Sequence, residues 1–288
     1  MRVLELFSGL GGWRCALQDQ GLVVAAYDVS EVANATYALN HGDVPKAREL
    51  AAVSLEDLAA HRADTWLMSP PCQPFCRMGN HQGLEDRRSR AFRHLMELFS
   101  QAPPDHLVLE NVGGFLGSDA HALLSECVRV QGMHQLDLQA CPSRFGLPNQ
   151  RPRAFIVASR RPLKVRPLPD LPPRSLTDFL DGQEDESLYL RPEVLARYHY
   201  GLDLVEASDR RSTCFIGGYG RRLVGSGSFL KTDRGVRRFS PSEVARLHGL
   251  PEGFRFPEPL SLEVRYRLLG NGLSIPVAAW ALDHLTAR

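Results

Sequence analysis

The sequence predicts an α/β protein built on a mostly parallel, doubly wound sheet. Short apolar strands alternate with helical segments along much of the chain, and this alternation is typical of parallel sheets covered by helices. Glycine, acidic residues and a cysteine come directly after the strands, where sheets of this type bind their ligands. The chain has 288 residues, of which 43% are apolar, enough for one large domain or for a domain with a small appendage.

The expected elements follow from apolar runs bounded by glycine, proline and polar residues. In chain order they are a strand over 3–7, a glycine-rich turn over 8–12, a helix over 13–20, a strand over 22–27, a helix over 31–40, strands over 64–68 and 106–109, a helix over 120–130 and a strand over 154–158. Further on, "SPSEV" resembles a capped helix start, and "LLGNGLSIPVAAWALDHL" predicts a turn followed by an apolar helix.

The chain is expected to divide into three stretches, of which residues 1–160 form the main α/β domain. The proline-rich "RRPLKVRPLPDLPPRS" is typical of an extended linker, and the glycine-rich "CFIGGYGRRLVGSGSFL" predicts turns and short strands. We therefore expect a small insert over 165–235 and a return to the main domain over 236–288.

The glycine-rich turn and the acid after the second strand suit a nucleoside ligand. Glycines let the backbone approach a ligand, and Asp28 can accept hydrogen bonds from both ribose hydroxyls. The pattern Gly-x-Gly-x-x-Gly is absent, and the shorter "FSGLGG" argues against a pyrophosphate cradle. A purely structural strand–helix turn explains the same residues, so both interpretations stay open at this point.

Cys72 differs in its setting from the other five cysteines. It lies in "SPPCQPFCRMG" after the strand over 64–68, and Pro71 and Pro74 stiffen the turn that presents its thiol. It is either a nucleophile or a buried structural cysteine, whereas Cys76 lacks such framing and is interpreted as structural. No Cys/His pair has zinc spacing, so we predict no metal site. Without a secretory signal, the thiols are expected to be reduced and the protein cytoplasmic.

Glu110 and two arginines are further candidates. Glu110 follows the strand over 106–109 and can act as a general acid, or simply cap a turn. In "NQRPRAF", Arg151 and Arg153 are expected on one side of an incoming strand because side chains alternate. Such a pair suits a carboxylate, a phosphate or a base edge, and it also occurs on solvated surfaces.

The overall charge points to no class of partner. The net charge is +1, so no overall field attracts nucleic acid, although local arginine clusters can bind phosphates or stay solvated. These clusters comprise Arg87, Arg88, Arg90, Arg93, Arg210, Arg211, Arg221, Arg222, Arg237 and Arg238. No apolar run reaches about 18 residues, which argues against a membrane span. We expect no obligate protein partner.

Five motifs together resemble the cytosine-5 methyltransferase family. They are "ELFSGLGG", "SPPCQPF", "ENV", "NQRPR" and "RLLGNGLSIPV", in the family's order and over nearly the whole chain. Within the family, "LMSPPCQPFCRMG", "CFIGGYG" and "RYRLLGN" are similar to the tRNA(Asp) cytosine-38 methyltransferases, the type-two homologues of the DNA enzymes. The resemblance implies a Rossmann-like S-adenosylmethionine-dependent methyltransferase sheet, an antiparallel strand near 154–158, and a small target-recognition insert.

The resemblance also implies a reaction. Cytosine C5 is a poor nucleophile, and a thiolate that adds to C6 makes C5 nucleophilic. Cys72 matches that thiolate, Glu110 matches the residue that binds the N3 and N4 edge of cytosine, and Arg153 matches the O2 contact with Arg151 in support. The methyl group comes from S-adenosylmethionine, and the target base must leave its stack. The implied substrate is tRNA, with DNA as the alternative.

A pocket for S-adenosylmethionine follows from the same resemblance. Asp28 takes the ribose, Val29 lies against the adenine, and Leu50 contributes at the adenine edge. The loop around the methionine part and the rest of the pocket are assigned to Phe7, Gly9, Leu10, Gly12, Pro71, Asn271, Gly272 and Leu273.

Three positions depart from the family pattern. Ile216 stands where the tRNA branch has threonine, which removes a polar contact and bears on the identity of the tRNA. Gly272 replaces a serine, and Asn149 stands where the DNA enzymes carry glutamine. A short insert leaves little room for loops that read several base pairs, which favours RNA. The presence of Cys72 and Glu110 argues against a third hypothesis, a catalytically silent nucleic-acid binder.

Overall fold

The chain forms two compact units in a computed structural model that describes residues 1–73, 83–182 and 185–285. The first unit comprises residues 1–140, 152–167 and the chain from Val277, and the second comprises 141–151 and 168–276. These units differ from the three expected stretches, because the chain returns to the first unit at Val277 rather than at 236. The helical patterns between these positions are ordinary, and only their packing shows which unit they join.

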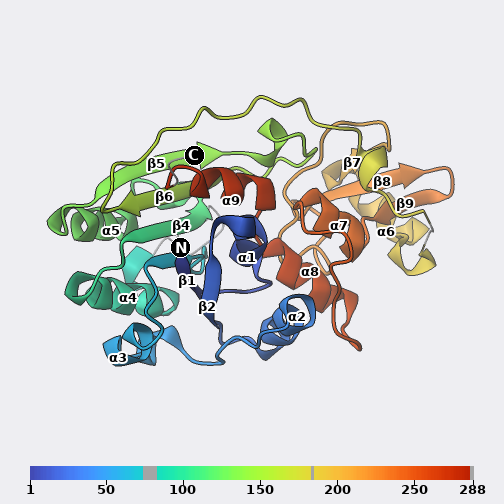
Figure 1. The fold of residues 1–288 in the computed structure, drawn as a ribbon. Coiled ribbons are helices and arrows are strands. Elements are labelled where there is room, and N and C mark those ends of the chain that lie inside the picture. Colours follow the sequence, from blue (N-terminus) through green and yellow to red (C-terminus); the bar gives the residue numbers. More distant parts are fainter. Residues whose placement is uncertain (74–82, 183–184, 286–288) are drawn as a thin grey trace. The chain divides into compact units, whose positions relative to one another are not determined.

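The first unit is built around a six-stranded sheet with the order β2-β1-β3-β4-β6-β5 (Figure 1). Its strands are β1 (Arg2–Leu6), β2 (Leu22–Tyr27), β3 (Thr65–Met68), β4 (His106–Val112), β5 (His134–Ala140) and β6 (Arg153–Ser159). Strands β1 to β4 run parallel, whereas β6 pairs antiparallel with both β4 and β5. The predicted mostly parallel sheet and its antiparallel strand near 154–158 are confirmed.

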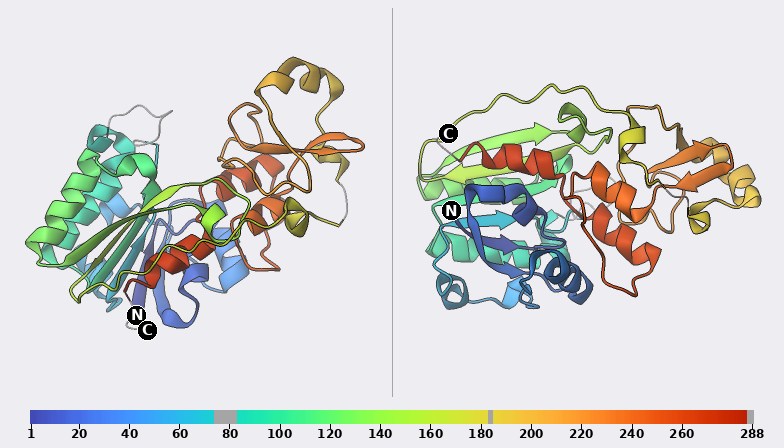
Figure 2. Two further views of the ribbon diagram at one scale, coloured as in Figure 1. Left: turned by 90° about the horizontal axis from the view of Figure 1, so that it is seen from above. Right: turned by 45° about the vertical axis from the view of Figure 1, so that its right-hand side comes forward.

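Helices cover both faces of this sheet (Figure 2). One face carries α4 (Arg90–Gln101) and α5 (Asp119–Val130), and the other carries α1 (Gly12–Leu17) and α9 (Ile275–Leu282), while α2 (Glu31–His41) and α3 (Leu55–Ala59) complete the unit. The alternation of β1 assigns its side chains to the two faces. Leu4 and Leu6 join the core against α4, and Glu5 between them contacts the start of α1.

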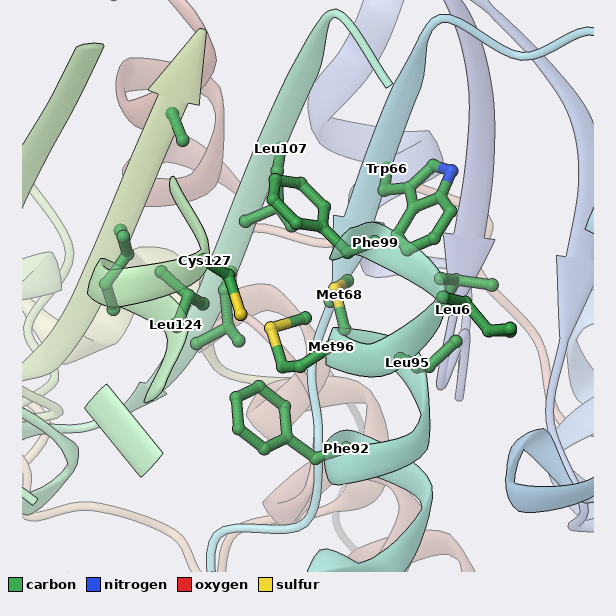
Figure 3. Packing of buried hydrophobic residues seen from close by; sticks show 14 of the residues in the cluster. Leu6, Trp66, Met68, Phe92, Leu95, Met96, Phe99, Leu107, Leu124 and Cys127 are labelled. Atoms are coloured by element: carbon green, nitrogen blue, oxygen red, sulfur yellow. The ribbon is translucent and has the colours of Figure 1, made fainter. Parts of the chain in front are cut away.

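The main core lies between the sheet, α4 and α5. Figure 3 shows Phe99 of α4 beside Leu107 and Met96 beside Met68, with Phe92 on the same helix. These side chains are at most 2% exposed, because α4 repeats its apolar residues at helical spacing and presents one apolar face. This packing holds the strands in register up to the edge where the site residues emerge.

The second unit contains a three-stranded sheet with the order β7-β8-β9. Its strands are β7 (Asp203–Val205), β8 (Ser228–Thr232) and β9 (Gly235–Arg238), and its helices are α6 (Pro192–Tyr198), α7 (Pro241–Leu247) and α8 (Leu262–Gly270). A capping box of Ser240 and Glu243 begins α7, as "SPSEV" predicts. Phe215, Tyr219 and Phe239 form a buried aromatic cluster. In the described ranges, no helix combines the length and apolar character that a bilayer crossing requires.

Candidate active site

The carboxyl ends of the parallel strands bring four expected site segments to one edge of the sheet. Leu6, the last residue of β1, pairs with Tyr27 on one side and with Met68 on the other, and Met68 pairs with Leu109. The segments that follow these residues therefore lie side by side. In order along the edge they are Asp28, Phe7–Gly12, Ser69–Cys72 and Glu110.

The turn after β1 has a backbone shape that favours close approach of a ligand. Phe7 and Gly9 have φ angles of 58° and 52°, in the left-handed region. No described atom lies within 4 Å of the point where a Cβ of Gly9 would stand. The Gly9 amide donates to Asp28 Oδ2 at 2.9 Å, and the Ser30 amide donates to Asp28 Oδ1 at 2.8 Å. Asp28 thus ties the end of β2 to the turn.

These residues fit a nucleoside-bearing ligand such as S-adenosylmethionine. Each Asp28 oxygen has the lone pairs to accept a further hydrogen bond from a ribose hydroxyl, and Val29 is 64% exposed, which suits contact with an adenine face. Leu50, by contrast, is 3% exposed and belongs to the main core. Its side chain packs against protein, and its contact with the adenine edge stays a prediction. Leu10 is also buried, so only its backbone can face a ligand.

A buried carboxylate lies beneath this turn. Glu5 is fully buried, and it accepts hydrogen bonds from the Trp13 amide at 3.1 Å and the Tyr37 hydroxyl at 2.9 Å. Burial raises the pKa of Glu5 to about 7, although these hydrogen bonds act to lower it. Sequence reasoning gave Glu5 no role, but an acid inside an apolar strand signals a buried polar group that needs partners.

The segment that leads to Cys72 is held from two sides. The indole nitrogen of Trp13 donates to Ser69 Oγ at 2.9 Å, and the side-chain amide of Asn111 donates to the Pro70 carbonyl at 3.0 Å. Both donors are at most 1% exposed. Cys72, two residues beyond Pro70, is partly buried. The Asn111 bond therefore fixes the approach to Cys72 against β4, the strand that carries Glu110.

The structure describes Pro71 beside Cys72 but not Pro74 or Cys76. Pro71 is partly buried next to Cys72, and its contact with a cofactor stays a prediction. Pro74 and Cys76 lie outside the described residues, so the structural role assigned to Cys76 is not tested.

The sequence predicts a strand that ends at residue 109, just before Glu110. In the structure, β4 continues to Val112, so Glu110 lies within it. The strand continues because β6 pairs with it, with Phe155 opposite Glu110 and Arg153 opposite Val112. Arg153 Nε lies 3.2 Å from Glu110 Oε1, and the two side chains are 14% and 10% exposed. The Arg153 guanidinium also donates to the Pro152 carbonyl at 2.8 Å. Shielding from water strengthens this ion pair, so carboxylate and guanidinium hold each other at the sheet edge.

Arg151 and Arg153 do not share a strand, contrary to expectation. β6 begins at Arg153, and Arg151 belongs to the second unit. Its buried guanidinium donates to the carbonyls of Phe215, Gly270 and Gly272 at 3.1, 2.9 and 2.7 Å. Arg151 therefore stabilises the backbone around the end of α8, and its support of the O2 contact stays a prediction.

The three remaining cofactor candidates also lie in the second unit. Asn271 is exposed at the C-terminal cap of α8, Gly272 is partly buried, and Leu273 is buried. Their contacts with a cofactor stay predictions. Across the part of the chain that the structure describes, no group of three or more His, Cys, Asp or Glu side chains is arranged to hold a metal ion.

Comparison with known proteins matches this arrangement. The family model for C-5 cytosine-specific DNA methylases matches residues 1–213 and 207–286. The human tRNA (cytosine(38)-C(5))-methyltransferase is 30% identical over 97% of this chain and 97% of its own length. A DNA (cytosine-5)-methyltransferase of Dictyostelium discoideum is 27% identical over 100% of this chain and 94% of its own.

A solved structure is similar over the whole length as well. The Entamoeba histolytica methyltransferase EhMeth aligns with a TM-score of 0.92 at 26% sequence identity, and 99% of each chain is covered. The strand order and the family match agree with the resemblance found in the sequence motifs. The chain therefore belongs to the C-5 cytosine-specific DNA methylase family.

Proposed function

We propose that this methyltransferase transfers a methyl group from S-adenosylmethionine to C5 of a cytosine in tRNA, at position 38 of the anticodon loop. The single observation that carries the chemistry is the tie between Asn111 and Pro70, 3.0 Å long, which joins the approach to Cys72 to the strand of Glu110. Relatives named for tRNA cytosine 38 support the choice of substrate. When bound, the cofactor supplies an electrophilic methyl group on a sulfonium.

The residues at the edge supply the other half of the reaction. The Cys72 thiolate adds to C6 of the cytosine, which forms a carbon–sulfur bond and makes C5 nucleophilic. Glu110 hydrogen-bonds the N3 and N4 edge and favours the protonated ring, while Arg153 contacts O2. C5 would then take the methyl group that the bound cofactor supplies, and the bond between this methyl group and the cofactor's sulfur would break. Loss of the C5 proton to a base breaks the bond to sulfur and regenerates the thiolate.

DNA is the second candidate substrate, because one relative is named as a DNA methyltransferase. The short insert expected from the sequence favoured tRNA over DNA, but the size of the second unit does not support this preference. The second unit spans 141–151 and 168–276, so it is larger than the insert on which the argument against base-pair reading depended. The preference for tRNA therefore rests on the relatives named for tRNA.

The arginine clusters differ in exposure, and only exposed arginines can contact a phosphate backbone. Arg237 is buried in a two-bond ion pair with Glu243, and this pairing removes it from any RNA surface. Arg87 in the 3₁₀ turn before α4, and Arg90 and Arg93 in the first turn of α4, are exposed. They form no ion pair with a described residue. Their spacing of three places neighbouring members on one side of the helix start, which suits a polyanion.

Incubation with methyl-labelled S-adenosylmethionine tests the proposal. The substrates are a tRNA(Asp) transcript, the same transcript with uridine at position 38, and a cytosine-containing DNA duplex. We expect label in the first alone. Equal labelling of the DNA duplex would favour the second candidate, and equal labelling of the position-38 variant would contradict the assigned site. Cys72→Ala serves as the inactive control.

A further inference from the structure

We propose that Trp13 is a positioning residue that couples the cofactor turn to the loop bearing Cys72. Its backbone belongs to the first turn of α1, directly after "FSGLGG". Its indole nitrogen donates to Ser69, which lies three residues before Cys72. The coupling concerns the methyltransferase chemistry itself and does not depend on whether the nucleic acid is tRNA or DNA.

The backbone of Trp13 is fixed to the turn. It follows Gly12 directly in α1, and its amide donates to the buried carboxylate of Glu5 at 3.1 Å. A change in the turn's backbone therefore changes the position or tilt of the indole. Tyr37 donates to the second oxygen of Glu5 at 2.9 Å, which keeps that carboxylate oriented.

The side chain of Trp13 is equally constrained. It is 1% exposed, and its ring meets Phe155 edge to face with centroids 6.1 Å apart. The indole has a single N–H group, and Ser69 Oγ accepts it at 2.9 Å. Since Phe155 pairs with Glu110 across β4 and β6, the indole also lies against the strands that carry the ion pair.

The route from Ser69 to the thiol is short and stiff. Pro70 and Pro71 separate Ser69 from Cys72, and each proline ring fixes a backbone φ angle. Asn111 holds the Pro70 carbonyl to β4, and the indole of Trp13 holds Ser69 to the helix that follows the cofactor turn. A ligand that favours one arrangement of the turn therefore shifts the population of Cys72 orientations.

The test uses the full chain without nucleic acid. Iodoacetamide modification of Cys72 is followed by mass spectrometry of its peptide, with and without S-adenosylhomocysteine, in wild type, Trp13→Phe, Ser69→Ala and the double variant. Phenylalanine retains an aromatic ring against Phe155 but lacks the N–H group. We expect S-adenosylhomocysteine to change the rate at which iodoacetamide modifies Cys72 in wild type. Each single variant should reduce that change about three- to tenfold, the range for one hydrogen bond.

The pattern across the variants separates coupling from other causes. The double variant is expected to reduce the effect no further than either single variant, because both remove the same interaction. Trp66→Phe is the matched control, since Trp66 is also a buried tryptophan that meets a phenylalanine ring at 6.1 Å, and it should behave as wild type. Two results would overturn the proposal. One is that S-adenosylhomocysteine changes the modification rate of Cys72 equally in wild type, Trp13→Phe and Ser69→Ala. The other is that it leaves this rate unchanged in wild type.

Discussion

The Arg153 guanidinium lies 3.2 Å from the Glu110 carboxylate across the antiparallel pairing of β6 and β4. The two residues are far apart in sequence. They meet because β6 runs antiparallel to β4 and begins with Arg153, close to the end of β4. Both side chains are largely buried, so each is oriented by the other before a base arrives. The two residues proposed to contact the base are thus preorganised.

Replacement of Glu110 by glutamine should lower kcat strongly, because the amide keeps the size of the side chain but cannot serve as an acid. The expected loss is about 10²- to 10⁴-fold, measured as initial methyl-transfer rates at saturating cofactor. Affinity for S-adenosylhomocysteine should be unchanged by calorimetry. Glu126→Gln, at an exposed glutamate of α5, is the control and should keep full activity. A Glu110→Gln enzyme with wild-type kcat would remove Glu110 from catalysis.

Asp28→Ala should weaken cofactor binding by about 1.5–3 kcal/mol, the scale of hydrogen bonds to a charged group. The change removes the acceptor for the ribose and the ties to Gly9 and Ser30. Calorimetric titration with S-adenosylhomocysteine measures the loss. Glu31→Ala, in the first turn of α2, is the neighbouring acidic control and should bind as wild type does. Unchanged affinity in a folded Asp28→Ala protein would place the ribose elsewhere.

Glu5 should make stability depend on pH. Its pKa is about 7 in the folded protein because of burial, against an ordinary value of 4.5. The folded state therefore holds a proton that the unfolded chain releases between these values. This contribution to stability is complete below pH 4.5 and is lost as the pH rises through about 7.

Glu5→Gln, neutral at every pH, isolates this effect. Relative to wild type, the variant should gain on the order of 2 kcal/mol in unfolding free energy between about pH 5 and pH 8. Urea unfolding at the two pH values gives the difference. A constant difference between the two proteins across this window would show that Glu5 does not change its protonation there.

The arginine clusters should separate into structural and surface groups. Arg237→Met leaves Glu243 buried without its partner, and the expected loss of stability is about 3–5 kcal/mol. Replacement of Arg87, Arg90 and Arg93 by glutamine should leave the unfolding free energy unchanged but weaken tRNA binding and flatten its dependence on salt. An unaltered salt slope in the triple variant would return these arginines to the solvated surface.

Local patterns were sufficient to predict much of the first unit. The strand over 22–27 has the predicted bounds, and the helices over 31–41 and 119–130 differ from expectation by one residue at one end, because apolar periodicity and serine caps determine them locally. The strand β5 was missed because it lies at the sheet's edge, where its side chains are mostly half-buried or exposed and the apolar pattern is weak.

Tertiary pairing determined what the sequence could not predict. Glu110 became part of β4 only through its pairing with β6. The bonds of Trp13 to Ser69 and of Asn111 to Pro70 join segments that are 56 and 41 residues apart, beyond the reach of local patterns. Leu50 was assigned to the adenine by motif alignment alone, whereas its apolar side chain packs in the core. Local motifs therefore do not indicate which contacts hold the site segments in place.

The most direct test of the account is to trap the covalent adduct with tRNA that contains 5-fluorocytosine at position 38. Fluorine cannot leave as a proton does, so the bond between sulfur and C6 persists after methyl transfer. Wild type and Cys76→Ala should each give a stable protein–RNA species on a denaturing gel. Cys72→Ala should give none while it still binds S-adenosylmethionine. An adduct that survives in Cys72→Ala, or that is lost in Cys76→Ala alone, would contradict the assignment of Cys72 as the nucleophile.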